Sequence, residues 1–233
     1  MNLKSATVSK LKAQFAAALL VLLSACGSGG PPPPDWKADA ADLIERYKKH
    51  ELLGENILAE RYFQQAVAAT GGAGRVADTA RLWLVRCATR KTSLADDDCH
   101  EYAELARIDT TAEDRAYYQF ITLRWSEVDA TKLPKQYAGL MQAEAGKINP
   151  QISSIDDPLS RLLAASLMTM RKQANDATLS IAAETASSQG WRRPLLVYLK
   201  LQEKQAFGRG DSVEQARLKV RIQLVEDAYS GPH

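Results

Sequence analysis

Three cysteines, Cys26, Cys87 and Cys99, are the residues of this chain most suited to covalent chemistry. A thiol can carry a lipid, join a second thiol in a disulfide, or bind a metal as a thiolate. Cys26 follows an apolar run and two small residues, whereas Cys87 and Cys99 lie close together, with an acidic run at 96–98 between them. Their surroundings therefore predict different chemistry for the first cysteine and for the other two.

The first 25 residues have the pattern of an export signal. Lys4, Lys10 and Lys12 stand in a stretch without acidic residues, and nine apolar residues follow, Phe15 to Leu23. A basic start, a short apolar core and small residues at the cut site are typical of secretory signals. The apolar run is too short to span a bilayer, because that takes about 20 residues. An ordinary signal peptide with an incidental cysteine and a buried N-terminal helix are the alternatives.

The residues Leu23-Ser24-Ala25-Cys26 resemble the lipobox of bacterial lipoproteins. This resemblance implies diacylglycerol transfer to the Cys26 thiol, cleavage before Cys26 and N-acylation of the new terminus, as in palmitate-bearing lipoproteins. Residues 1–25 would then be the signal peptide. Gly27 stands where an inner-membrane retention signal has aspartate, which favours the outer membrane of a Gram-negative host. The expected location is the periplasmic face of the outer membrane, held by the lipid.

The composition of residues 26–35 predicts a spacer after the lipid anchor. Gly27 to Gly30 make its first part flexible, and the four prolines Pro31 to Pro34 favour an extended polyproline II conformation. We expect this spacer to hold a folded body, residues 36–230, away from the membrane surface.

Cys87 and Cys99 form an even pair in a chain that we expect to enter an oxidising compartment, so a disulfide is predicted between them. Closing a loop of this length stabilises the fold by about 3 kcal/mol in the chain-entropy model. Two free thiols are the alternative. His100 and the acidic run 96–98 could coordinate a cation, but their spacing matches no zinc motif, so no metal site is predicted.

The charge balance excludes a nucleic-acid-binding surface of the usual kind. The chain has 30 basic and 28 acidic residues, and three of the lysines belong to the signal. The chain from Cys26 onwards therefore carries 27 basic and 28 acidic residues, with no basic field. No nucleic-acid partner and no cofactor are predicted.

No catalytic residue is predicted. The three histidines, His50, His100 and His233, stand outside any zinc-protease motif, and no serine lies in a nucleophile-elbow pattern. The glycines of segment 71–74 follow a helix without the rest of a phosphate-binding motif, so a helix end and turn are expected there. A pair of carboxylates like that of a glycosidase is left open as an alternative.

Apolar residues recur at helical spacing along most of the body, and no segment alternates as a strand would. About eight or nine helices are predicted. They cover 36–70 with a bend or break at Gly54, 76–89, 99–108, 109–128, 133–145, 159–170, 176–189, 191–207 and 211–229. The prolines of 149–158 allow a division into two lobes there.

The last helix, 211–229, carries two apolar stripes. Val213, Ala216 and Val220 lie on one; the other consists of Leu218, Ile222, Val225 and Tyr229. A helix with two apolar faces is expected to be sandwiched between neighbours. The hairpin Trp191 to Tyr229 nevertheless ends the body, so it is also expected to act as its capping unit.

The helix pairs weakly resemble tetratricopeptide repeats. Ala59, Tyr62, Ala66, Gly72, Ala77 and Ala80 place small residues where two helices of a repeat would touch. The full consensus in a 34-residue period is absent. The resemblance implies antiparallel helix pairs stacked as a right-handed all-α array with a concave binding face.

The expected function is a membrane-anchored scaffold or accessory subunit that binds another envelope protein. The alternative is a hydrolase of the cell envelope, acting for example on the wall through an unrecognised carboxylate site.

Overall fold

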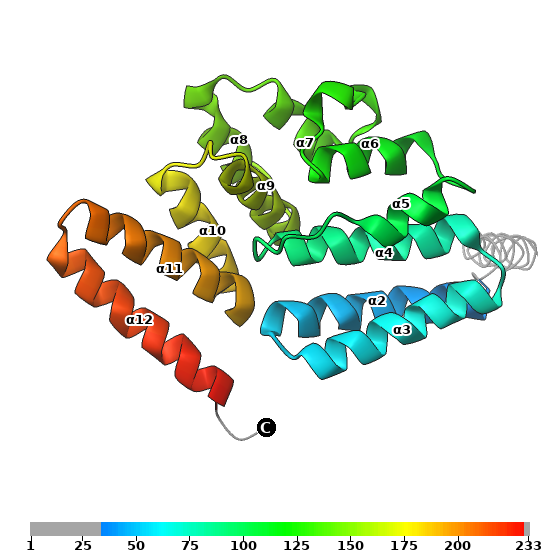
Figure 1. Ribbon diagram of the computed structural model, residues 1–233, viewed down its shortest axis with the longest axis horizontal. Coiled ribbons are helices and arrows are strands. Elements are labelled where there is room, and N and C mark those ends of the chain that lie inside the picture. Colours follow the sequence, from blue (N-terminus) through cyan, green and yellow to red (C-terminus); the bar gives the residue numbers. More distant parts are fainter. Residues whose placement is uncertain (1–33, 231–233) are drawn as a thin grey trace, which may run out of the picture. The chain divides into compact units, whose positions relative to one another are not determined.

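The computed structural model describes residues 34–230, and these residues form an all-helical body (Figure 1). Within them there are eleven α-helices, three short 3-10 helices and no strand, so the predicted all-α class is confirmed. The α-helices are α2 (Asp35–Leu53), α3 (Asn56–Gly72), α4 (Val76–Lys91), α5 (His100–Ala106), α6 (Ala112–Ile121), α7 (Lys135–Met141), α8 (Ile148–Ser153), α9 (Pro158–Met170), α10 (Asp176–Ser188), α11 (Arg192–Gly208) and α12 (Ser212–Ser230). None of these helices is both long enough and apolar enough to cross a membrane.

The predicted element 36–70 is two helices. Gly54 has a φ of +85°, which glycine adopts without the steric cost of a side chain. The amide of Glu55 donates to the carbonyl of His50 at 2.9 Å, which closes the end of α2 before α3 begins. The two helices then form a hairpin.

The α2–α3 hairpin has its own small apolar cluster. Tyr47 and Phe63 face each other across it with ring centroids 5.2 Å apart, and Trp83 of α4 packs edge-on against Phe63 at 4.6 Å. Leu82 of α4 completes the cluster with Ile44, Ala59 and Ala66.

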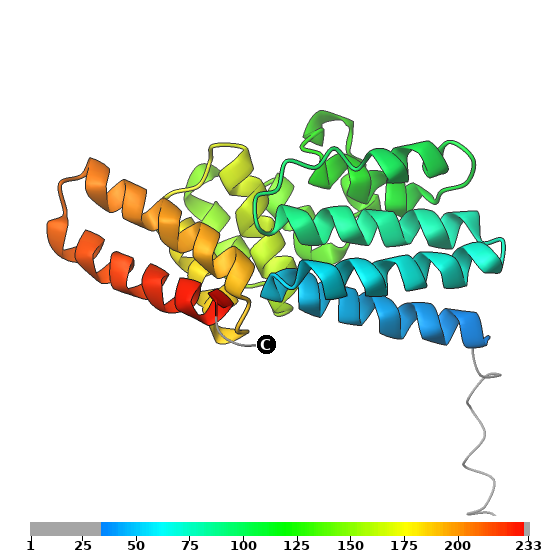
Figure 2. The ribbon, with the colours of Figure 1, turned by 60° about the horizontal axis from the view of Figure 1, so that its bottom comes forward.

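Helix α4 contributes to both apolar clusters because it buries two faces. Leu82 contacts the small cluster, whereas Ala80, Leu84 and Cys87 belong to the larger one, which extends to α12. α4 therefore joins the first hairpin to the rest of the body, as Figure 2 shows.

Helix α6 begins at Ala112, within the predicted segment 109–128, and ends well before the end of that segment. The side chain of Thr111 accepts a hydrogen bond from the amide of Asp114 at 3.0 Å, a standard N-cap. The helix predicted to continue to Val128 stops at Ile121 because Leu123 adopts a φ of +63°. Trp125 then donates its indole N–H to the carbonyl of Phe120 at 2.9 Å, which fixes the turn.

The middle of the body has more helices than predicted. Segment 133–145 forms only α7, and the proline-marked segment 149–158 contains most of α8. Ile152 and Ile155 in that segment are buried in the larger cluster, and residues from Trp36 onwards form one compact unit.

The C-terminal third consists of longer helices with well-defined starts. Asp157 caps α9 by accepting from the amide of Ser160 at 2.7 Å, and Asn175 with Thr178 forms a capping box at α10. Consecutive helices from α9 to α12 pack against each other as antiparallel neighbours. Leu162, Tyr198 and Leu199 are fully buried at the centre of this packing.

The two apolar stripes of α12 differ in burial. Leu218 is 1% exposed against α11, while Val213 and Val220 are 80% and 62% exposed. The expectation that neighbours cover both faces is therefore wrong, because within the described residues α11 is the one helix that packs along α12.

Candidate functional site

A groove on the body brings together residues from several helices within 34–230. It consists of two cavities of about 550 and 220 Å³ that share four lining residues, Val85, Tyr117, Tyr137 and Ser160. We call it the tyrosine groove. The larger volume lies within the range of about 300–1,000 Å³ that is usual for ligand sites.

Five separate segments position the lining of the tyrosine groove. Helix α4 provides one wall through Leu84 and Val85, and α6, segment 131–137 and α9 provide the others. Lys48 of α2 lines the smaller cavity. Since α2 and α9 are more than 100 positions apart in the sequence, only the tertiary packing assembles this site.

Tyr117 and Tyr137 are held by aromatic packing. Their ring centroids lie 6.0 Å apart, and the ring of Tyr137 also lies 5.0 Å from that of Phe120. Phe120 in turn stacks on Trp125 at 5.2 Å. These successive ring contacts hold the side chains of Tyr117 and Tyr137 in place.

Both phenols of the groove are protonated at neutral pH, as the ordinary tyrosine pKa of about 10 requires, and burial raises their pKa further. Burial raises the pKa of Tyr117 well above its ordinary value. Burial also raises the pKa of Tyr137 to about 12, although hydrogen bonding with Ser160 and Tyr117 opposes this shift. At neutral pH the groove therefore offers neutral hydroxyl groups that can donate and accept hydrogen bonds.

The carboxylates at the edge of the groove already have partners. Arg81 binds Asp114 with two nitrogens, at 3.2 and 2.9 Å, and Lys132 Nζ lies 3.5 Å from Glu113 Oε1. Asp157 is used as the cap of α9. The edge is thus polar but close to neutral.

The lining of the groove combines apolar side chains with a few polar groups. The lining of the smaller cavity includes Asp157, but its carboxylate accepts from the backbone amide of Ser160 at 2.7 Å, as the cap of α9. The Ser160 hydroxyl accepts a hydrogen bond from Gln136 Nε2 at 3.5 Å. Apolar walls with a few neutral polar groups suit an uncharged or mixed ligand segment.

Sequence reasoning did not identify these two tyrosines as a site. Helical periodicity places Tyr117 in the predicted segment 109–128 and Tyr137 in 133–145, and it gives neither residue a functional role. A tyrosine carries a polar hydroxyl on an apolar ring, so two tyrosines on neighbouring short segments are a weak signal for a groove.

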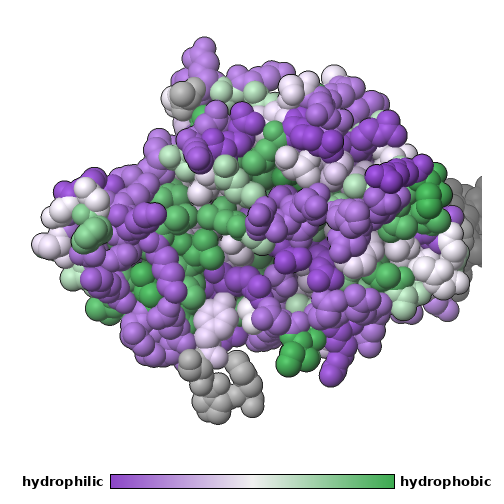
Figure 3. All heavy atoms as spheres, viewed as in Figure 1, coloured by the Kyte–Doolittle hydropathy of each residue, from purple (hydrophilic) through white to green (hydrophobic). Residues whose placement is uncertain are grey.

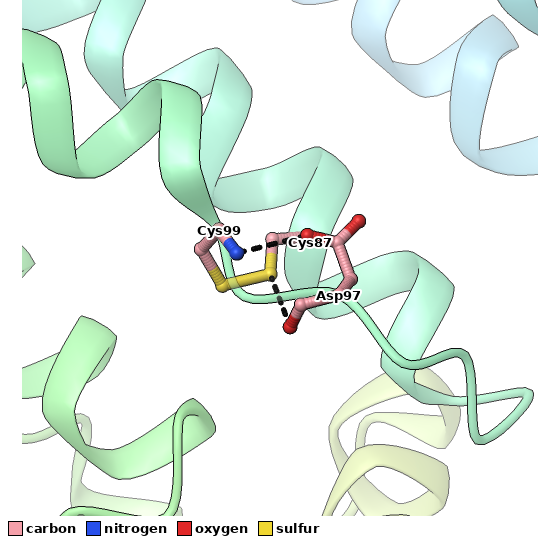
Figure 4. A group of neighbouring side chains, drawn as sticks. All are labelled: Cys87, Asp97 and Cys99. Carbon is pink, nitrogen blue, oxygen red and sulfur yellow. Dashed lines mark hydrogen bonds between the residues drawn. A yellow bond between two sulfur atoms is a disulfide. The ribbon is translucent and has the colours of Figure 1, made fainter.

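The structure brings the predicted cysteine pair together. Cys87 lies near the end of α4 and Cys99 directly before α5, and their Cα atoms lie 5.4 Å apart, within the range that a disulfide spans. Figure 4 shows the two sulfur atoms joined, with Asp97 beside them. Ligand atoms of Cys87, Asp97 and Cys99 lie within 4.8 Å of one another, but sulfur joined in a disulfide is not a thiolate ligand.

The acidic run before Cys99 has structural partners. Asp97 accepts from the amide of Cys99 at 2.9 Å, and its other oxygen lies 2.8 Å from Arg90 Nη1. Asp98 accepts from the amide of His100 at 3.1 Å. These contacts order the loop and the start of α5.

Cys26, the predicted lipid attachment site, lies outside the described residues, as do the signal peptide and nearly all of the spacer. No protein-family model, curated protein or solved structure matches this chain.

Proposed function

We propose that this chain is a lipid-anchored envelope protein that binds an extended segment of a partner protein in the tyrosine groove. The observation that carries the proposal is the combination of apolar walls with the neutral hydroxyls of Tyr117, Tyr137 and Ser160. The backbone of an extended peptide needs hydrogen-bond partners along its length, and its side chains need apolar surface.

The anchor belongs to the same proposal. The lipobox-like residues before Cys26 support attachment to the periplasmic face of the outer membrane, with the proline-rich spacer between the lipid and the body. A scaffold or accessory subunit fits this arrangement, because the groove could then meet partners close to the membrane.

A bulky residue inside the groove tests the binding site. Ser160→Phe should fill the space that the two cavities share, since Ser160 lines both. The matched control is Ser187→Phe, which places the same ring on the exposed surface of α10. Both variants should keep the circular dichroism spectrum and melting temperature of the native chain.

The measurement is photo-crosslinking in cells. The full-length chain would carry a photoreactive amino acid at Gln136, which lines the larger cavity. We expect Ser160→Phe to abolish a defined protein crosslink that Ser187→Phe retains. Turnover of a wall fragment or peptide that is lost on changing one Glu or Asp, with no protein crosslinked, would contradict the proposal and favour the hydrolase.

A further inference from the structure

Helix α12 presents an apolar stripe on the side away from α11. Val213, Val220 and Leu224 are 80%, 62% and 65% exposed, whereas Leu218 on the opposite side is 1% exposed. Phe207, at the end of α11 before the turn into α12, is 70% exposed. In Figure 3 apolar residues interrupt the hydrophilic surface over the region of these two helices.

The spacing of the stripe is that of a helix-pairing seam. Positions 213, 217, 220 and 224 alternate by four and three residues, the repeat that keeps one face of a helix toward a partner helix. The segment is about 17 Å long at the rise of an α-helix. Arg217 is the one charged residue in the seam, and its aliphatic stem can pack against apolar neighbours while its charge stays in water.

We propose that α12 pairs in antiparallel orientation with α12 of a second copy of this chain. In that pairing Val213 faces Leu224 of the second copy, and Val220 faces the stem of its Arg217. Each apolar contact occurs twice because the arrangement has two-fold symmetry.

The charges beside the seam select the antiparallel orientation. Glu214 and Arg221 flank the seam on the same side, so antiparallel pairing brings each Glu214 next to Arg221 of the other copy. Arg221 has no ion pair within residues 34–230. The carboxylate of Glu214 forms an ion pair only with the exposed Arg217, whose Nη1 lies 3.2 Å from Glu214 Oε2. Parallel pairing would instead bring the two Arg217 side chains together, which is unfavourable.

The contact is short, so the dimer should be weak and reversible. Stable interfaces bury about 1,200–2,000 Å² in total, and a single pair of helices of this length lies at the low end. We therefore expect an association that depends on protein concentration.

Cysteine crosslinking of two full-length copies tests the pairing. One tagged copy carries Val213→Cys and a differently tagged copy carries Leu224→Cys, and mild oxidation should join the two different copies. Ile57→Cys and Ile108→Cys are the matched control, because these residues are 79% and 74% exposed on other helices. Parallel pairing would give Val213→Cys homodimers, and their predominance would contradict the proposal.

Two further variants test the apolar and the charged contacts separately. Val220→Glu should lower the crosslink yield by about tenfold, with an unchanged melting temperature because Val220 is exposed. Glu214→Arg should weaken the crosslink, and adding Arg221→Glu in the same chain should restore it. The proposal is overturned by a yield no higher than the control, by insensitivity to Val220→Glu, or by failure of the charge swap to restore the crosslink.

Discussion

Arg192 and Glu55 lie 137 positions apart in the sequence, yet Arg192 Nη2 lies 3.0 Å from Glu55 Oε1. Arg192 stands at the start of α11, and Glu55 lies in the turn between α2 and α3. The same guanidinium donates through Nη1 to the carbonyl of Ala228 in α12 at 2.8 Å. This contact connects the first hairpin of the body to the last one.

Neighbouring residues enlarge this contact into a polar cluster. His50 Nδ1 lies 2.5 Å from Glu55 Oε2, and Arg193 Nη1 lies 3.2 Å from Glu51 Oε1. Arg193 also donates to Asn56 Oδ1. The small apolar cluster is separate from the larger one, so these polar contacts help α4 to hold the α2–α3 hairpin in place.

The first prediction concerns Arg192. We expect Arg192→Ala to lower the free energy of unfolding by about 1–3 kcal/mol, because it leaves a half-buried Glu55 carboxylate without this charge-assisted partner. Arg107→Ala is the control, since the pair of Arg107 with Glu104 is exposed at the C-terminal end of α5 and should contribute little. Urea denaturation of both variants measures the difference, and equal stabilities would contradict the role given to Arg192.

The second prediction concerns Gly54. A side chain there would meet the ring of Tyr229 and would also have to adopt a φ of +85°. We expect Gly54→Ala to destabilise the fold by about 1–3 kcal/mol, and the double change with Tyr229→Ala to recover only the part due to the ring.

Gly71→Ala is the matched control for Gly54. Gly71 lies in the last turn of α3, and a Cβ there meets nothing within 4 Å. Replacing a helical glycine by alanine should be neutral or stabilising by about 0.5–1 kcal/mol. Thermal unfolding compares the variants; if Gly54→Ala melted no lower than Gly71→Ala, the close approach of Tyr229 would be irrelevant to stability.

The third prediction is an alkaline loss of stability through Tyr137. Its pKa is about 12 in the folded chain because of burial, against about 10 in an unfolded chain. The folded state therefore binds more protons between these values, and its stability falls as the pH rises from about 10 through about 12. Two pKa units correspond to about 3 kcal/mol.

Tyr137→Phe tests this pH dependence. The variant should lose less stability than the native chain between about pH 10 and 12, since it has no phenol to ionise at this position. Part of the slope should remain because burial also raises the pKa of Tyr117 and Tyr198. Identical pH profiles for the two chains would argue against a buried Tyr137 hydroxyl.

The fourth prediction concerns Cys87 and Cys99. Protein purified without reductant should have no free thiol at these positions by alkylation and mass measurement. The double change Cys87→Ala and Cys99→Ala should cost about 3 kcal/mol of stability in the chain-entropy model. Reductant should destabilise the native chain and leave the double variant unchanged; two alkylated thiols in the native chain would refute the disulfide.

The fifth prediction concerns the anchor. Cys26→Ser should leave the helical body folded but remove the protein from the membrane fraction, because residues 34–230 contain no membrane-spanning helix. Labelled palmitate should enter the native chain and not the variant. Absence of label from the native chain would end the lipoprotein proposal.

The parts of the fold that could be predicted from the sequence depend on signals between residues close together in the chain. Helical periodicity acts within a few residues of the chain, so the all-α class and the approximate positions of α6 and α9 could be predicted from the sequence. The pairing of Cys87 with Cys99 also follows from their number and spacing, and the structure places them at disulfide distance.

The end of α6 and the assembly of the tyrosine groove depend on packing between residues that the sequence pattern does not relate. Leu123 leaves the helical region although its neighbours continue the apolar pattern, since Trp125 folds back onto Phe120. The tyrosine groove needs Lys48, Tyr117 and Ser160 brought together from three helices.

The burial of the two apolar stripes of α12 also depends on tertiary packing. The sequence determined that both faces are apolar, because periodicity records which side chains share a face. Only the tertiary structure decided that α11 covers Leu218 and that Val220 remains exposed. The physical reason is that burial depends on the position of a second element, and the spacing of residues within one helix carries no information about that position.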